Sequence, residues 1–357
     1  MTAFEDLEPH EMRLPQGAIR YRELGAGEPI VLVHGLLTNS LLWADVASAL
    51  ANEFRVIAPD WPLGSHERPL DPAADLTPTG LARMIADFLA ALELEHVTLV
   101  GNDTGGALCQ LVAVHHSERL ARLVLTPCDA YENFLPPIFR PLQLLVRLPG
   151  AVWLIANALR PRLAQRLPMT FRWLSKRPLD PRIMQAFLRP ARSDRRIRRE
   201  LAAILRAISN RYTLTAAQRF GEFDKPVLVA WATEDRLFPF RHAERLADAF
   251  PNARLERIQD SYTFVSIDQP ERTADLIASF ARVPSPHSHD GPSPTRRGAE
   301  AVRAESAAPD APRASRGGHG RIPGCWYPAW WPDWSRGGSP AGRRTSSGCR
   351  HVRSAPF

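Results

Sequence analysis

The chain has 357 residues, of which 45% are hydrophobic and 23% charged, a composition typical of a soluble globular protein rather than a disordered one. No apolar run reaches the roughly 18 residues of a membrane-spanning helix. Four scattered cysteines are too few for a disulfide framework or a zinc site. The acidic, polar start MTAFEDLEPHEMRL lacks the regions of a signal peptide, so we expect a cytoplasmic protein. Neither a glycine-rich phosphate loop nor a cluster of metal ligands occurs, so no cofactor and no metal are predicted.

Strand-like and helix-like runs alternate along the first 283 residues. Apolar or alternating runs predict strands at residues 18–24, 29–35, 55–61, 96–100, 122–127 and 224–235, with a short one after residue 253. Helical spacing predicts helices at residues 39–54, 77–94, 104–116, 241–250 and 271–282. Asn39 or Ser40 is a suitable N-cap for the first of these helices. The alternation predicts an α/β protein with a mostly parallel sheet that is covered by helices on both faces.

The alternation stops between residues 131 and 223, where the chain is helical, basic and punctuated by prolines. Because this segment is inserted between two core strands, we expect a lid over the carboxyl ends of the sheet, where open α/β sheets bind ligands. Its apolar stretches, such as LQLLVRLPGAVWLIANAL, fit either simple packing or a hydrophobic small-molecule pocket. We predict a two-part core (residues 1–130 and 224–283), a lid (131–223) and a disordered tail rich in Pro, Gly and Arg (284–357).

Positive charge is concentrated in the predicted lid. The formal net charge of the chain is +7, and residues 140–220 hold 18 Lys or Arg against 3 Asp or Glu. Arginines on solvated helix surfaces explain such a run. The less favoured alternative is a face that contacts an anionic ligand, a membrane surface or a nucleic acid. No nucleic-acid-binding motif accompanies the charge, so no nucleic acid is expected as a partner.

The stretch GNDTGG, residues 101–106, follows the strand-like run HVTLV and precedes an apolar helical run. Gly101 and Gly105 lie two residues before and after Asp103, which is the G-x-Nu-x-G spacing of a nucleophile elbow between a strand and a helix. The apex residue is an aspartate rather than a serine, so the pattern indicates a carboxylate nucleophile. The alternative for Asp103 is a simple helix N-cap.

The ordered set of motifs resembles the α/β-hydrolase fold superfamily over residues 17–283. The aspartate elbow is similar to that of the branch containing haloalkane dehalogenases and epoxide hydrolases. His34 and Gly35 follow a buried strand where that family has its oxyanion loop. The segment TEDRLFP sets Asp235 at the family's acid position, and DQPERTADLIASF resembles its C-terminal helix.

This resemblance implies a role for each motif residue. Asp103 would attack an electrophilic carbon, and the backbone N–H groups of Leu36 and Thr104 would form the oxyanion hole. Asp235 would orient a histidine, as the third member of a catalytic triad does. The alternative for Asp235 is a solvent-facing loop position. For His34 we favour hydrogen bonding to the backbone over a part in the chemistry.

The sequence departs from the family where the triad histidine should stand. Counting along DSYTFVSIDQP puts Thr263 at that position, and a threonine hydroxyl cannot act as a general base near pH 7. The candidate substitutes are Asp129, Glu132 and His242.

Three functions remain open at this point. The first is a hydrolase with an unusual base that acts on an apolar ester, epoxide or related electrophile. The second is an isomerase or lyase in which Asp103 moves protons. The third is a non-catalytic binding protein of the same fold. Thr104, where the dehalogenases have tryptophan, disfavours a dehalogenase. The Leu36–Leu37 pair and Tyr212, the single tyrosine well inside the lid, disfavour an epoxide hydrolase.

Overall fold

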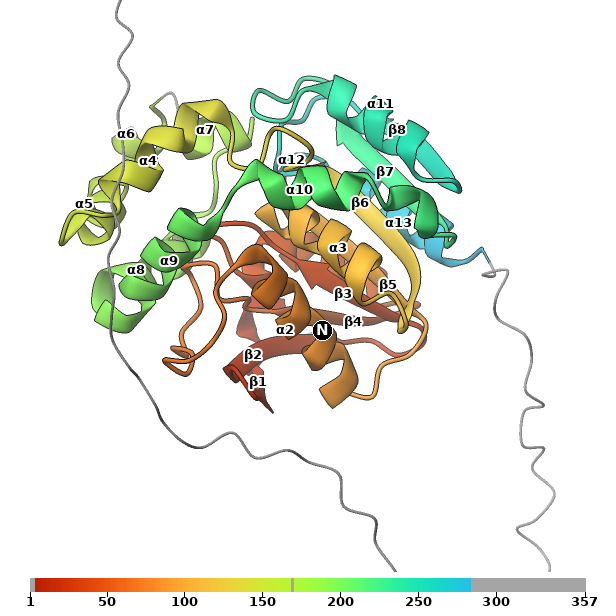
Figure 1. Ribbon diagram of the computed structural model, residues 1–357, viewed down its shortest axis with the longest axis horizontal. Helices are drawn as coiled ribbons and strands as arrows, with labels where there is room; N and C mark the ends of the chain where they lie inside the picture. Colours follow the sequence, from red (N-terminus) through yellow and green to blue (C-terminus); the bar gives the residue numbers. More distant parts are fainter. Residues whose placement is uncertain (1–3, 168–169, 284–357) are drawn as a thin grey trace, which may run out of the picture. The chain divides into compact units, whose positions relative to one another are not determined.

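The computed structural model describes residues 4–167 and 170–283 (Figure 1). The predicted disordered tail, residues 284–357, lies outside the described residues. Cys109 and Cys128 are free and buried in the core. None of the described helices has the length and apolar character needed to cross a lipid bilayer.

Eight strands form one sheet in the order β1-β2-β4-β3-β5-β6-β7-β8. From β4 to β8 all neighbouring pairs are parallel, whereas β2 pairs antiparallel with both β1 and β4. The predicted mostly parallel sheet is therefore confirmed. The bounds are β1 (His10–Leu14), β2 (Gly17–Leu24), β3 (Pro29–Val33), β4 (Arg55–Pro59), β5 (Val97–Asp103), β6 (Leu120–Cys128), β7 (Val227–Ala232) and β8 (Ala253–Ile258).

The strands that could be predicted from the sequence are those whose side chains are buried. All nine residues of β6 and all six of β7 are buried, so these strands read as continuous apolar runs, as strands covered on both faces do. The edge strand β1 was not predicted. Its sequence HEMRL leaves only Leu14 buried, so it carries neither an apolar run nor an apolar alternation.

Helices cover both faces of the sheet (Figure 1). On one face, α2 (Pro78–Ala91), α3 (Thr104–His115) and α11 (Phe240–Ala249) share a core with the sheet. On the other face, α1 (Ala44–Leu50) packs against α13 (Pro270–Ala281). The helix predicted at residues 39–54 is shorter than expected. Asn39 caps a 3-10 turn, η2 (Ser40–Trp43), and α1 follows it.

The segment inserted between β6 and β7 is helical. It contains α4 (Arg140–Leu145), α5 (Ala151–Ala158), α6 (Arg162–Gln165), α7 (Phe171–Leu174), α8 (Pro181–Ser193), α9 (Arg195–Ala207) and α10 (Asn210–Ala217). The side chains of Asp180 and Asp194 accept a backbone N–H at the starts of α8 and α9, which fixes where these helices begin. Figure 1 shows α4, α5 and α6 close together at the upper left, apart from the helices that cover the sheet.

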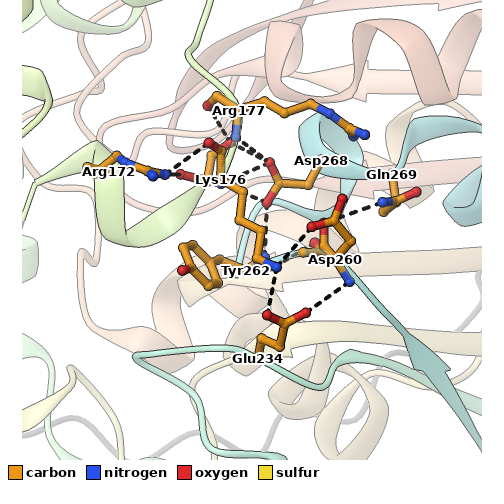
Figure 2. Close-up of polar contacts among 10 residues, drawn as sticks. Arg172, Lys176, Arg177, Glu234, Asp260, Tyr262, Asp268 and Gln269 are labelled. Carbon is orange, nitrogen blue, oxygen red and sulfur yellow. Dashed lines mark hydrogen bonds and ion pairs between the residues drawn. The ribbon is translucent and has the colours of Figure 1, made fainter.

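A buried carboxylate ties the inserted segment to the core just after α7 (Figure 2). Asp268 accepts hydrogen bonds from the hydroxyl of Ser175 at 2.7 Å and from the backbone N–H of Lys176 at 3.0 Å. The ammonium of Lys176 pairs with Glu234 at 2.7 Å and with Asp260 at 2.9 Å. These contacts join the exit of α7 to the loops that follow β7 and β8.

Candidate active site

Asp103 sits at a sharp turn between β5 and α3, with φ 53° and ψ −133°. Positive φ is uncommon for a residue with a side chain, and such strain is concentrated at functional sites. The turn needs its glycines. A Cβ on Gly101 would lie 2.6 Å from the Cα of Gly106, and a Cβ on Gly105 would lie 2.3 Å from the carbonyl oxygen of His34. The G-x-Nu-x-G spacing therefore reflects close backbone approach on both sides of Asp103.

The Asp103 carboxylate faces two backbone donors. It accepts hydrogen bonds from the N–H groups of Thr104 and Leu36, the pair that the sequence assigned to an oxyanion hole. Gly35 makes room for it, because a Cβ there would lie 2.1 Å from Oδ2 of Asp103. Burial, with a smaller contribution from the charge of Asp235, raises the pKa of Asp103 to about 7 against the opposing effect of the two N–H donors.

Asp235 follows β7 and is held in one orientation by three donors. The backbone N–H groups of Leu237 and Phe238 each donate to Oδ1 at 2.7 Å, and the hydroxyl of Thr263 donates to Oδ2 at 2.9 Å. Burial raises the pKa of Asp235 to about 7 as well. Thr263 therefore makes the hydrogen bond to the acid that an imidazole would make in a triad.

The loop that carries Thr263 is locked to the elbow by a residue that sequence reasoning missed. The side-chain amide of Asn102 donates to the carbonyl oxygen of Thr263 at 2.8 Å and to the hydroxyl of Thr126 at 2.9 Å. Nothing in the sequence marked Asn102, because it occupies a variable position of the elbow pattern. These hydrogen bonds tie the backbone of Thr263 to Asn102, the residue that directly precedes Asp103.

A second buried carboxyl lies beside the elbow. Asp129 accepts the Thr104 hydroxyl at 3.1 Å and the backbone N–H of Leu135 at 2.9 Å. Burial and then the charge of Asp103 raise the pKa of Asp129 well above its ordinary value. Both oxygens of Asp129 are thus engaged by the elbow and by the loop after β6, and Asp129 does not itself line the cavity at Asp103.

The other two candidate bases form a separate cluster near α11. Glu132 pairs with Arg245 at 2.7 Å, and the nearer ring nitrogen of His242 lies 3.9 Å from Glu132. The His242 ring meets Tyr131 edge to face, and burial lowers the pKa of His242. Among the described contacts, none joins Glu132 or His242 to Asp103.

His34 is fully engaged by the backbone. Its Nε2 accepts the N–H of Trp61 at 2.8 Å, and its Nδ1 lies 2.9 Å from the carbonyl oxygen of Gly35. Burial lowers the pKa of His34 to about 3, so the ring is neutral. With both nitrogens engaged, His34 stabilises the loop that carries Leu36.

Asp103 lies at a large apolar pocket between the core and the inserted segment. The cavity has a volume of about 760 Å³, and its polar lining residues are Asp103, Thr104 and Thr170. Its walls come from the loop after β6 and from α4, α5 and α7, for example Phe139, Leu142 and Leu174. A single half-buried carboxylate at an apolar cavity suits a hydrophobic ligand with one reactive carbon.

Comparison with known proteins identifies the family. Residues 28–270 match the family model described as alpha/beta hydrolase fold. An uncharacterised protein of Mycobacterium tuberculosis H37Rv is 30% identical over 286 residues, covering 76% of this chain and 80% of that protein. Haloalkane dehalogenase 2 of the same strain is 28% identical over 292 residues, covering 73% and 91%. A cis-3-alkyl-4-alkyloxetan-2-one decarboxylase of Shewanella oneidensis is 26% identical over 280 residues, covering 73% and 84%.

The fold and the pocket define an α/β enzyme scaffold with an inserted helical region over the carboxyl ends of its strands. The chain belongs to the α/β hydrolase fold family.

Proposed function

We propose that this protein is a hydrolase-class enzyme in which the Asp103 carboxylate attacks an electrophilic carbon of an apolar small molecule. The observation that carries the proposal is the half-buried Asp103 side chain at positive φ, at a cavity whose lining is otherwise almost wholly apolar. A carboxylate is a competent nucleophile when it is desolvated and held in place. Because its pKa is about 7, a large fraction of Asp103 is ionised at neutral pH.

The first step forms a covalent ester. One Asp103 oxygen bonds to the substrate carbon as the bond from that carbon to its leaving group breaks. The N–H groups of Leu36 and Thr104, which hydrogen-bond to the free carboxylate, then lie where they can hold the carbonyl oxygen of the ester. The apolar walls exclude water during this step.

The second step lacks its usual base. Hydrolysis of the ester needs a group that removes a proton from water, and the Thr263 hydroxyl is a donor to Asp235 with no basic site of suitable pKa. The oxygens of Asp129 are engaged by Thr104 and Leu135, and His242 has no described contact with Asp103. We therefore expect the ester to form faster than it breaks down, so that it accumulates.

Intact-mass spectrometry tests this proposal. After incubation with 1,2-epoxyhexane the wild-type protein should gain one hydroxyhexyl group, and after incubation with 1-bromohexane one hexyl group, with bromide released. Peptide mapping should locate the added group on Asp103. The Asp103→Asn variant should stay unmodified, because its amide is a very weak nucleophile. An adduct on another residue, or equal labelling of Asp103→Asn, would rule out the proposed role.

A second candidate function is supported by Thr263 together with the similarity to a decarboxylase that acts on a dialkyl oxetan-2-one. In that substrate class Asp103 would attack C4 of the four-membered lactone and break the C4–O1 bond, which frees a carboxylate on C3. Loss of CO2 from C3 would then form the C3=C4 double bond and expel the Asp103 carboxylate. This sequence restores the enzyme with no water and no general base, so the absence of a histidine would not slow it.

A cis-3,4-dialkyl oxetan-2-one separates the two candidates. The lyase predicts many equivalents of alkene and CO2 per protein, measured by gas chromatography, with none from Asp103→Asn. The hydrolase predicts a hydroxy acid, or a stable adduct with at most one equivalent consumed. Alkene formation that survives in Asp103→Asn would contradict the lyase.

A further inference from the structure

Large apolar side chains are exposed together on the first helices of the inserted segment. Their exposed fractions run from 43% to 75%, and we call them the leucine face: Leu144, Leu145, Leu148, Trp153, Leu154, Leu163 and Leu167. They lie on or beside α4, α5 and α6, which are grouped at the upper left of Figure 1. Large apolar side chains exposed in this number on neighbouring helices of one segment are typical of an interaction site.

The leucine face lies within a positively charged region. Residues 133–179 contain 8 Lys or Arg and no Asp or Glu. Beside the leucine face is a hollow of about 580 Å³, which we call the arginine hollow. Its lining includes Trp153 and five arginines: Arg147, Arg195, Arg198, Arg199 and Arg206.

The arginines of the hollow are largely unneutralised. Among the ion pairs of the described residues, none involves Arg147, Arg195 or Arg199. The one acid of α9, Glu200, turns inward, where it meets His66 at 2.7 Å and the backbone N–H of Leu70 at 3.0 Å. The hollow therefore offers planar guanidinium groups to an external anion, the geometry that suits phosphate.

We propose that the leucine face and the arginine hollow together bind the surface of an anionic phospholipid bilayer. Apolar side chains that enter the boundary between headgroups and acyl chains, flanked by cations that meet lipid phosphates, are the features of a protein that lies on a membrane. A second copy of this chain fits less well, because a symmetric contact would bring the same arginines together. A nucleic acid would leave the leucines in water.

The proposed surface continues into the pocket. Leu144, Leu145 and Leu148 belong to the leucine face and also line the cavity at Asp103. A bilayer bound here would lie at the apolar walls that lead to the carboxylate, so the substrate class would be lipid-soluble molecules taken from the membrane. This last step rests on the proposed function, whereas membrane binding itself does not.

Vesicle flotation with the full-length protein tests the proposal. The protein should float with phosphatidylcholine vesicles that contain phosphatidylglycerol, should float much less with phosphatidylcholine alone, and should be released by salt. Because each surface arginine contributes about a fivefold factor in binding, Arg147→Gln/Arg195→Gln/Arg199→Gln should weaken binding on the order of a hundredfold. Leu154→Ser/Leu163→Ser, at two exposed positions outside the pocket, should weaken binding at unchanged charge.

The matched control removes the same charge elsewhere. Arg241→Gln/Arg254→Gln/Arg272→Gln changes α11, β8 and α13, and should keep binding close to that of the wild type. Equal loss in the control, or vesicle binding that neither lid variant weakens, would overturn the proposal. So would a stable dimer in light scattering that Leu154→Ser/Leu163→Ser dissociates, since a second copy would then cover the leucine face. Labelling of Asp103 in solution is independent of these outcomes, so the two proposals fail separately.

Discussion

Replacing Thr263 with histidine is expected to speed hydrolysis of the Asp103 ester by about 10²- to 10⁴-fold, the usual contribution of a positioned general base. Asp235 is already oriented for the new ring, because Leu237 and Phe238 hold one of its oxygens and the Thr263 hydroxyl reaches the other at 2.9 Å. An imidazole that donates to Asp235 would present its second nitrogen to water near the ester carbonyl. The variant should therefore change from a single turnover to many.

Decay of the labelled protein measures this effect. The protein is alkylated, freed of excess reagent, and followed by intact mass as the ester is lost. Thr263→Val, which removes the hydroxyl at nearly constant volume, should decay as slowly as the wild type. Adding Asp235→Asn to Thr263→His should abolish most of the gain. A folded Thr263→His protein whose ester decays at the wild-type rate would show that this position does not reach the reacting water.

Replacing Asp103 with asparagine is expected to stabilise the fold at pH 8 by about 2 to 4 kcal/mol while leaving it almost unchanged at pH 4. The pKa of Asp103 is about 7 in the folded protein against an ordinary value of 3.8 for an aspartate, so the folded state holds the proton more tightly. The resulting stability is present at low pH and is lost as the pH rises through about 7. Asparagine tolerates positive φ and does not ionise, so the variant escapes this loss.

Urea unfolding of both proteins at a series of pH values checks this prediction. The difference in unfolding free energy between variant and wild type should grow as the pH rises from 4 to 8. Glu222→Gln is a suitable comparison, because Glu222 is exposed and Arg219 lowers its pKa, so it should not show this pattern. A constant difference across the series would mean that the Asp103 carboxyl does not titrate with a raised pKa.

Sequence reasoning predicted the fold where local pattern and burial agree. The apolar runs of β5, β6 and β7 are fully or almost fully buried. The positions two residues before and after Asp103 must be glycine, because neighbouring backbone atoms leave no room for a Cβ. These features follow from short-range rules. The edge strand β1 was not predicted, because it is a strand through its pairing with β2 and not through its own sequence pattern.

The parts of the site that sequence reasoning missed depend on long-range contacts. Asn102 and Asp268 act through partners more than 90 residues away, which no local motif records. The apolar stretch of the lid had two interpretations, packing or a pocket. The structure shows that part of this stretch is exposed to solvent instead, since Leu144, Leu148 and Leu154 are each more than 60% exposed. Amino-acid type alone cannot distinguish an apolar side chain that faces a core from one that faces solvent.

The anchor at Asp268 has a consequence for how substrates enter. One carboxylate holds both the chain leaving α7, through Ser175 and Lys176, and the loop of Thr263, through the backbone N–H of Tyr262. If α4–α7 move outward, the hinge must therefore lie before Ser175 in the sequence. A hinge after Ser175 would displace the Thr263 loop as well. The entrance can widen on its α4 side while the floor of the cavity stays fixed, so admission of a bulky molecule need not disturb the alignment of the two aspartates.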